Sequence, residues 1–168
     1  ELGTWSGSSF AADGSKTPVS ITIGAGETSL SAIRDKINAA GAGVTATIIT
    51  DANGARLSLS STATGAANGF RITAAETTDD GSSTTGLSTL GFTSTSGSPM
   101  TRSQSAGNAS ATINGIALSS ASNTLEGVAD GLTLTLLQTT TTAADVKVAS
   151  DTDNIRKSIE TFVSAFND

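Results

Sequence analysis

The chain has 168 residues, a formal net charge of −6, and no His, Cys or Tyr. The absence of Cys and His excludes disulfides, thiolate nucleophiles and the usual ligands of transition metals. No basic cluster is present to neutralise phosphates, so we expect no binding of nucleic acid or of an anionic membrane. Only 14% of the residues are charged, and Ser, Thr, Ala and Gly take their place. We expect no enzymatic activity, no cofactor and no metal site.

The first 23 residues predict two strands around a turn. Trp5 and Phe10 are the apolar anchors of the first strand, and residues 13–15 have turn chemistry. Apolar and polar residues alternate over 19–23, which indicates a half-buried second strand.

The period then changes to that of a helix. Thr28 or Ser29 can cap its start, and Gly41 stands where a left-handed residue ends a helix. The residues that share its apolar face are Leu30, Ile33, Ile37 and Ala40. Two strands follow at 44–50 and 56–60, joined by a hairpin that Asn53-Gly54 signals, and a short strand is expected at 70–73.

Residues 76–108 contain few apolar side chains that could form a core. Leu87, Leu90 and Phe92 predict a small apolar cluster around a helical turn, and residues 94–108 predict an exposed loop. Farther on, Asn123 and Glu126 have capping-box spacing, which predicts a single helical turn before a strand that starts at Gly131. This order resembles that of residues 28–47, so two related strand–helix–strand units are one interpretation and shared β composition is the other.

A final helix is predicted from Asp151 to Asp168, with acidic residues at its positive end. Its apolar side chains form one stripe that continues to the end of the sequence, so we expect the stripe to need a partner. Because the chain begins at Glu1 without Met, we interpret it as an excised fragment. The members of the stripe are Ile155, Ile159, Phe162, Val163 and Phe166.

Several patterns have a functional and a simpler interpretation, and the simpler one is favoured in each. Asp79-Asp80 indicates a solvated loop, and residues 151–154 indicate a helix cap because a calcium loop would need Gly at its sixth place. Residues 24–26 are turn glycines, Asn108 begins a chance glycosylation pattern, and Trp5 belongs to a core. A Ser–Lys nucleophile is chemically allowed, but no spacing supports it.

Three segments together resemble a known family. Residues 28–73 are similar to a repeat shared by flagellin and hook-associated proteins. The resemblance to the flagellar filament cap family, also called the hook-associated protein 2 family, is more specific. It rests on residues 111–116, 122–136 and the helix that follows. The resemblance implies a mainly β fold with short helices (α+β), made of two small β-rich head domains and the start of a C-terminal leg helix. We expect one head domain from residues 1–20 and 109–150, an inserted outer domain at 21–108, and the leg from 151–168.

The resemblance also implies a function. Members of the family form a ring at the distal end of the bacterial flagellar filament, outside the cell, where they guide exported flagellin subunits into place. The implied partners are further copies of the chain and flagellin, with host mucus glycans linked to some relatives. The alternatives are a β-rich surface adhesin or carbohydrate-binding module, and the outer domain of a flagellin. A head domain that continues into a helical leg favours the cap, because an adhesin module should end in a strand or linker.

Overall fold

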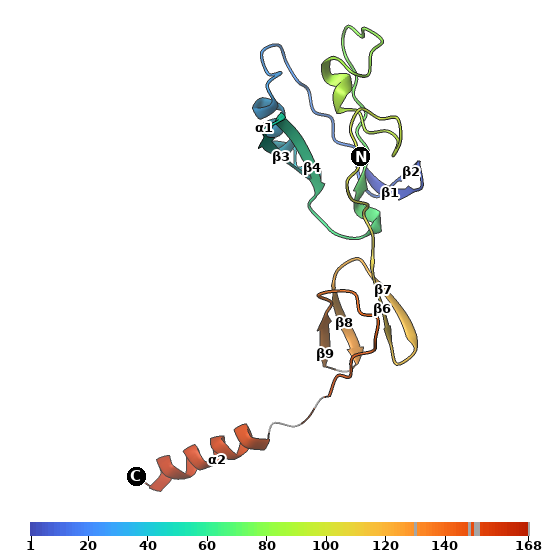
Figure 1. Cartoon of the computed structure of the whole chain (residues 1–168). Coiled ribbons are helices and arrows are strands. Elements are labelled where there is room, and N and C mark those ends of the chain that lie inside the picture. The colour runs from blue at the N-terminus through green and yellow to red at the C-terminus, as the bar shows by residue number, and fades with distance from the viewer. Residues whose placement is uncertain (130, 148, 150–151, 168) are drawn as a thin grey trace. The chain divides into compact units, whose positions relative to one another are not determined.

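The computed structural model describes residues 1–129, 131–147, 149 and 152–167 (Figure 1). It forms two compact units, Glu1–Leu137 and Gln138–Asp168. Strands dominate the first unit and a helix the second, so the expected mainly β fold with short helices is confirmed. Of the residues named above, Asp151 and Asp168 lie outside the described residues.

The first sheet has three antiparallel strands in the order β2-β1-β5. They are β1 (Leu2–Ser6), β2 (Ser9–Ala12) and β5 (Gly69–Phe70). Trp5 pairs with Phe10 across β1 and β2, so the two predicted anchors belong to two strands and not to one. The strand expected at 19–23 is wrong, because none of the strands that the structure describes pairs with that segment. Alternation alone does not make a strand when its hydrogen-bonding groups have no partner.

An aromatic cluster covers this sheet. The ring centroid of Trp5 lies 4.9 Å from that of Phe10 and 5.2 Å from that of Phe92. The indole Nε1 of Trp5 donates a hydrogen bond to the Phe70 carbonyl at 2.9 Å. Phe92 is 6% exposed and directly follows η2 (Gly86–Leu90), the helical turn expected there. Trp5 is therefore a half-buried packing residue of this cluster, which agrees with its interpretation as part of a core.

The helix α1 (Leu30–Ala39) has the predicted ends. The Ser29 hydroxyl accepts from Ala32 N–H at 3.2 Å, and Gly41 has a φ of 60°. This helix contacts the hairpin of β3 (Val44–Asp51) and β4 (Gly54–Ser61). The hairpin is confirmed, although Asp51 pairs with Gly54, so the turn consists of Ala52 and Asn53.

Two further hairpins complete the first unit. β6 (Ala109–Ile113) pairs with β7 (Ile116–Ser120), and β8 (Thr124–Ala129) pairs with β9 (Leu132–Thr135). The strand after Gly131 is thus confirmed. The helical turn expected around Leu125 is wrong.

The reason for that error lies in pairing and backbone geometry. Leu125 is 5% exposed and opposite Leu134, so burial in a hairpin outweighs the local capping signal. The register shifts between Glu126 and Ala129, where Gly127 has a φ of 66°, as at a β-bulge. The second of the two proposed strand–helix–strand units is therefore absent from the described part of residues 111–136.

Hydrogen bonds connect the segment around η1 (Ala66–Asn68) with these later hairpins. The Thr64 hydroxyl donates to the Ala121 carbonyl at 2.7 Å, and the Asn108 amide oxygen accepts from Ala66 N–H at 2.8 Å. The division into a discontinuous domain and an inserted domain stays a prediction. Any such division has to accommodate the pairing of β1 with β5, which joins the first residues of the chain to residues 69–70.

The second unit contains α2 (Thr152–Asn167). In the part of the chain that the structure describes, no helix has both the length and the apolar character needed to cross a membrane.

Candidate assembly surface

The polar side chains of α2 support the helix locally. The Arg156 guanidinium pairs with the Glu160 carboxylate at 2.9 Å, one turn away. The Thr161 hydroxyl donates to the Lys157 carbonyl at 2.8 Å, and Asp153 stands in the first turn, where a negative charge is favourable. The Arg156–Glu160 pair is exposed and is worth only roughly 0.3–0.5 kcal/mol. These polar contacts do not involve the apolar face of the helix.

The apolar face of α2 is open. The structure places all five residues of the predicted stripe on this one helix, and each is about half exposed or more. Their exposed fractions are Ile155 58%, Ile159 58%, Phe162 71%, Val163 49% and Phe166 82%. The steps of four, three and four between Ile155, Ile159, Phe162 and Phe166 are those of alternating d and a positions of a coiled-coil heptad, with Val163 at e. That spacing is typical of a helix that packs along another helix in a coiled coil.

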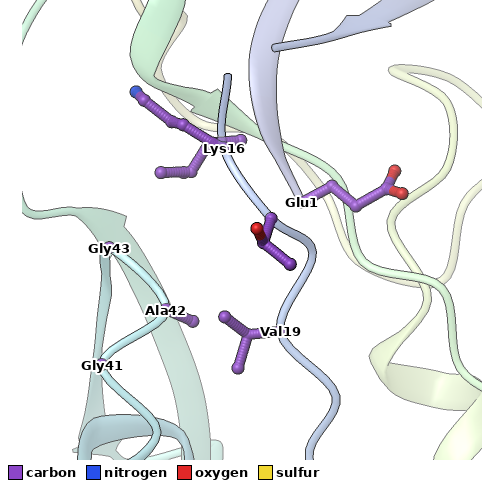
Figure 2. A pocket seen from close by; sticks show the side chains of 8 residues that line it. Glu1, Lys16, Val19, Gly41, Ala42 and Gly43 are labelled. Carbon is purple, nitrogen blue, oxygen red and sulfur yellow. The ribbon is translucent and has the colours of Figure 1, made fainter. Parts of the chain in front are cut away.

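Two pockets of the first unit offer little chemistry. One of 250 Å³ is lined by Glu1, Lys16, Val19 and the residues that follow α1 (Figure 2). Its charged groups are already paired, since Lys16 Nζ donates to the Asn68 amide oxygen at 2.9 Å and the Glu1 carboxylate pairs with Arg71. With this hydrogen bond and this ion pair formed, neither the Lys16 ammonium nor the Glu1 carboxylate is free to act as an acid or base.

The second pocket, of 330 Å³, is lined mostly by Ser, Thr and Gly and includes Asp79. Asp79 accepts from Gly81 N–H, and the neighbouring Asp80 accepts from Ser82 N–H, both at 2.8 Å. The Thr85 hydroxyl and the Ser82 N–H lower the pKa of the Asp80 carboxyl. The exposed acidic pair therefore acts as turn caps, in agreement with the interpretation of a solvated loop.

The remaining weak candidates also have structural roles. The Asn108 amide oxygen accepts from Ala66 N–H, and its Nδ2 donates to the Ser119 hydroxyl, so both polar atoms of the side chain have partners. Residues 24–26 form a turn that the Glu27 carboxylate closes on Gly24 N–H at 2.7 Å. Among the described residues, no three acidic side chains gather as metal ligands would.

Comparison with known proteins identifies the family. Residues 106–168 match the family described as the flagellar hook-associated protein 2 C-terminus, and residues 10–63 match the flagellin hook IN motif. The crystal structure of FliD (HAP2) from Pseudomonas aeruginosa PAO1 is 34% identical and superimposes with a TM-score of 0.69, covering 90% of this chain and 70% of that one. The chain belongs to the flagellar hook-associated protein 2 (FliD) family.

Other relatives agree with this assignment. The D2-D3 domains of the Escherichia coli flagellar cap protein FliD are 36% identical, with a TM-score of 0.65 over 79% of this chain and 65% of that one. Among curated proteins, the B-type flagellar hook-associated protein 2 of Pseudomonas aeruginosa is 35% identical over 88% of this chain. The chain spans about a third (33%) of that FliD relative. The adhesin, carbohydrate-binding and flagellin alternatives are not favoured by these matches.

Proposed function

We propose that the chain is the head region and the beginning of the leg of a flagellar filament cap protein. The complete protein caps the distal end of the filament, outside the cell, and guides the folding and insertion of exported flagellin. Its partners are further copies of itself, in a ring, and flagellin. The observation that carries the proposal is the exposed heptad stripe of α2, within the segment similar to the hook-associated protein 2 C-terminus.

The energetics support a covered leg. Burying one large apolar side chain is worth roughly 1.5–3 kcal/mol, so five such residues at half exposure or more represent a large unfavourable surface. A helix with an a/d stripe recovers this free energy when another helix packs along it. We therefore assign leg packing to Ile155, Ile159, Phe162, Val163 and Phe166.

The first unit suits a role in binding other molecules and not in catalysis. The whole chain lacks His and Cys, and the charged side chains of both pockets are held in hydrogen bonds or ion pairs. Glycan binding forms no part of the proposal, because Trp5, the single Trp of the chain, packs against Phe10 and Phe92.

The test uses the full-length protein in cells that lack their own cap gene product. The Phe162→Asp, Phe166→Asp double variant should weaken leg packing, so that flagellin is lost to the medium as monomer and swimming is poor. The matched control is Thr161→Asp with Ser164→Asp, which adds the same charge to the same helix at exposed positions outside the stripe. Normal filaments in the Phe variant, or equal defects in both variants, would reject the leg assignment.

A further inference from the structure

Three Asn-Gly dipeptides occur in the chain, at 53–54, 68–69 and 114–115. We infer that Asn53 and Asn114 are sites of spontaneous conversion to aspartate and isoaspartate, while Asn68 is protected by the fold. Asn followed by Gly is the sequence most prone to this reaction, because Gly has no side chain to obstruct attack by its own backbone nitrogen. The inference does not depend on the proposed function.

The reaction needs only water. The backbone nitrogen of the Gly loses its proton and bonds to the side-chain Cγ of the Asn, and the Cγ–Nδ2 bond breaks with release of ammonia. A five-membered succinimide results. Water then opens the ring at either carbonyl, which leaves an ordinary aspartate or an isoaspartate with one extra atom in the backbone. No oxidation or reduction takes place.

The side chains of Asn53 and Asn114 both have the freedom that this step requires, although Gly54, whose nitrogen attacks Asn53, pairs with Asp51 at the end of the β3–β4 hairpin. Each lies in the turn of a hairpin, Asn53 between β3 and β4 and Asn114 between β6 and β7, and each is exposed. Neither side-chain amide makes a hydrogen bond with any of the described residues. Asn114 and Gly115 have φ angles of 52° and 83°, which mark the two-residue turn of the primed type.

Asn68 has the same sequence neighbour but a different environment. Its amide oxygen accepts from Lys16 Nζ at 2.9 Å, and its Nδ2 donates to the Thr64 carbonyl at 2.6 Å. Gly69 is buried and pairs with Gly3 in the first sheet, where an added Cβ would lie 3.0 Å from the Gly3 carbonyl. Separate contacts therefore restrain the Asn68 side chain and the backbone nitrogen of Gly69.

Conversion would change the two hairpins. Each event adds one negative charge to a chain whose formal net charge is already −6. At residue 53 the new carboxylate would lie close in sequence to Asp51, whose own carboxylate pairs with Arg56 at 2.6 Å across the turn. At residue 114 isoaspartate lengthens the backbone of a turn that admits only two residues, which should loosen the pairing of β6 with β7.

The experiment is peptide mapping by mass spectrometry of the folded 168-residue chain after incubation at mildly alkaline pH. Enzymatic methylation of isoaspartate provides a second readout. The same chain incubated in urea is the reference, since there all three dipeptides should convert at similar rates. In the folded chain Asn68 should convert at least about tenfold more slowly than Asn53 and Asn114, because two side-chain hydrogen bonds must break first.

Two variants sharpen the test. Asn114→Gln should abolish conversion at that turn and leave Asn53 unchanged, because the longer Gln side chain cyclises far more slowly. Lys16→Met should speed conversion at Asn68 alone, since it removes one of the two bonds that hold the amide. Equal rates at all three sites in the folded chain would overturn the inference, and so would protection of Asn53 and Asn114 relative to the chain in urea.

Discussion

The side-chain amide of Asn38 binds both backbone polar groups of Ala46. Its Nδ2 donates to the Ala46 carbonyl at 3.0 Å, and its oxygen accepts from the Ala46 N–H at 2.7 Å. Ala46 is 1% exposed and lies in β3, which has β4 as its single strand neighbour. The amide therefore substitutes for a third strand at this position, and it fixes the last turns of α1 to the sheet edge.

Replacing Asn38 should destabilise the first unit strongly. Asn38→Ala leaves a buried N–H and a buried carbonyl without partners, at about 1–3 kcal/mol for each group. Asn38→Asp keeps the shape and the acceptor but loses the donor, so it should fall between the Ala variant and the wild type. Urea unfolding measures both. The control is Asn123→Ala, because the exposed Asn123 side chain makes no hydrogen bond with the described residues. A change below about 0.5 kcal/mol for Asn38→Ala would show that the bidentate contact is not formed in solution.

The aromatic cluster gives a second prediction with a built-in reporter. Phe92→Ala should lower the free energy of unfolding by about 3–5 kcal/mol, because it opens a cavity against Trp5 and Phe70. Trp5 is the single Trp of the chain, so its fluorescence should shift to the red as water reaches the indole. The matched control is Phe166→Ala, since Phe166 is 82% exposed and far outside this core in sequence. Equal effects of the two changes would contradict the assignment of Phe92 to the core.

The elements that the sequence predicts well are those whose signals are local. The α1 helix has its cap at Ser29, its apolar face and its left-handed Gly41 within a dozen residues, and all of these appear in the structure. The β3–β4 hairpin is similarly specified by alternation on both sides of one turn. The Asn-Gly signal at 53–54 predicts the turn one residue late, since Ala52 and Asn53 form it. At 114–115 the same dipeptide forms the turn itself, and both of its residues have positive φ.

The errors depend on partners that are distant in sequence. Residues 19–23 alternate as a strand does, yet no strand lies beside them. Leu125 sits in a capping-box pattern, yet it is buried opposite Leu134 in a hairpin. The pairing of β1 with residues 69–70 had no local signal at all. For α2 the stripe is readable from its spacing, but its five side chains are exposed, so leg packing stays a prediction.

Acid should weaken the closure of the loop before α1. The Glu27 carboxylate accepts from Lys36 Nζ and from Gly24 N–H, both at 2.7 Å. The Lys36 hydrogen bond first, and the Gly24 N–H second, lower the pKa of Glu27. Because the folded pKa lies below the unfolded one, the stabilisation is present above the unfolded pKa and is lost as the pH falls through the folded pKa.

Glu27→Gln should therefore reduce stability at neutral pH and have a much smaller effect at an acid pH below the folded pKa, where the wild-type carboxylate is itself neutral. Urea midpoints at the two pH values measure the difference. Glu126→Gln is the control, because Glu126 is exposed and forms no ion pair with the described residues. A Glu27→Gln effect that is the same at both pH values would mean that the carboxylate charge does not stabilise this loop.

A pair of glycine substitutions tests the connection between η1 and the later hairpins. Gly65 has a φ of 99°, and a Cβ added there would lie 2.7 Å from the Ala121 Cβ. Gly26 has a similar φ of 84° but open space around it. Both Ala variants should incur the cost of holding a non-Gly residue at positive φ, about 1–3 kcal/mol. Gly65→Ala should lose about 1–3 kcal/mol more, since the added methyl overpacks a contact that the Thr64 hydrogen bond to Ala121 holds together. Thermal and urea unfolding of the two variants give the comparison. If both lose the same free energy, the segment around Gly65 does not pack on Ala121 in solution.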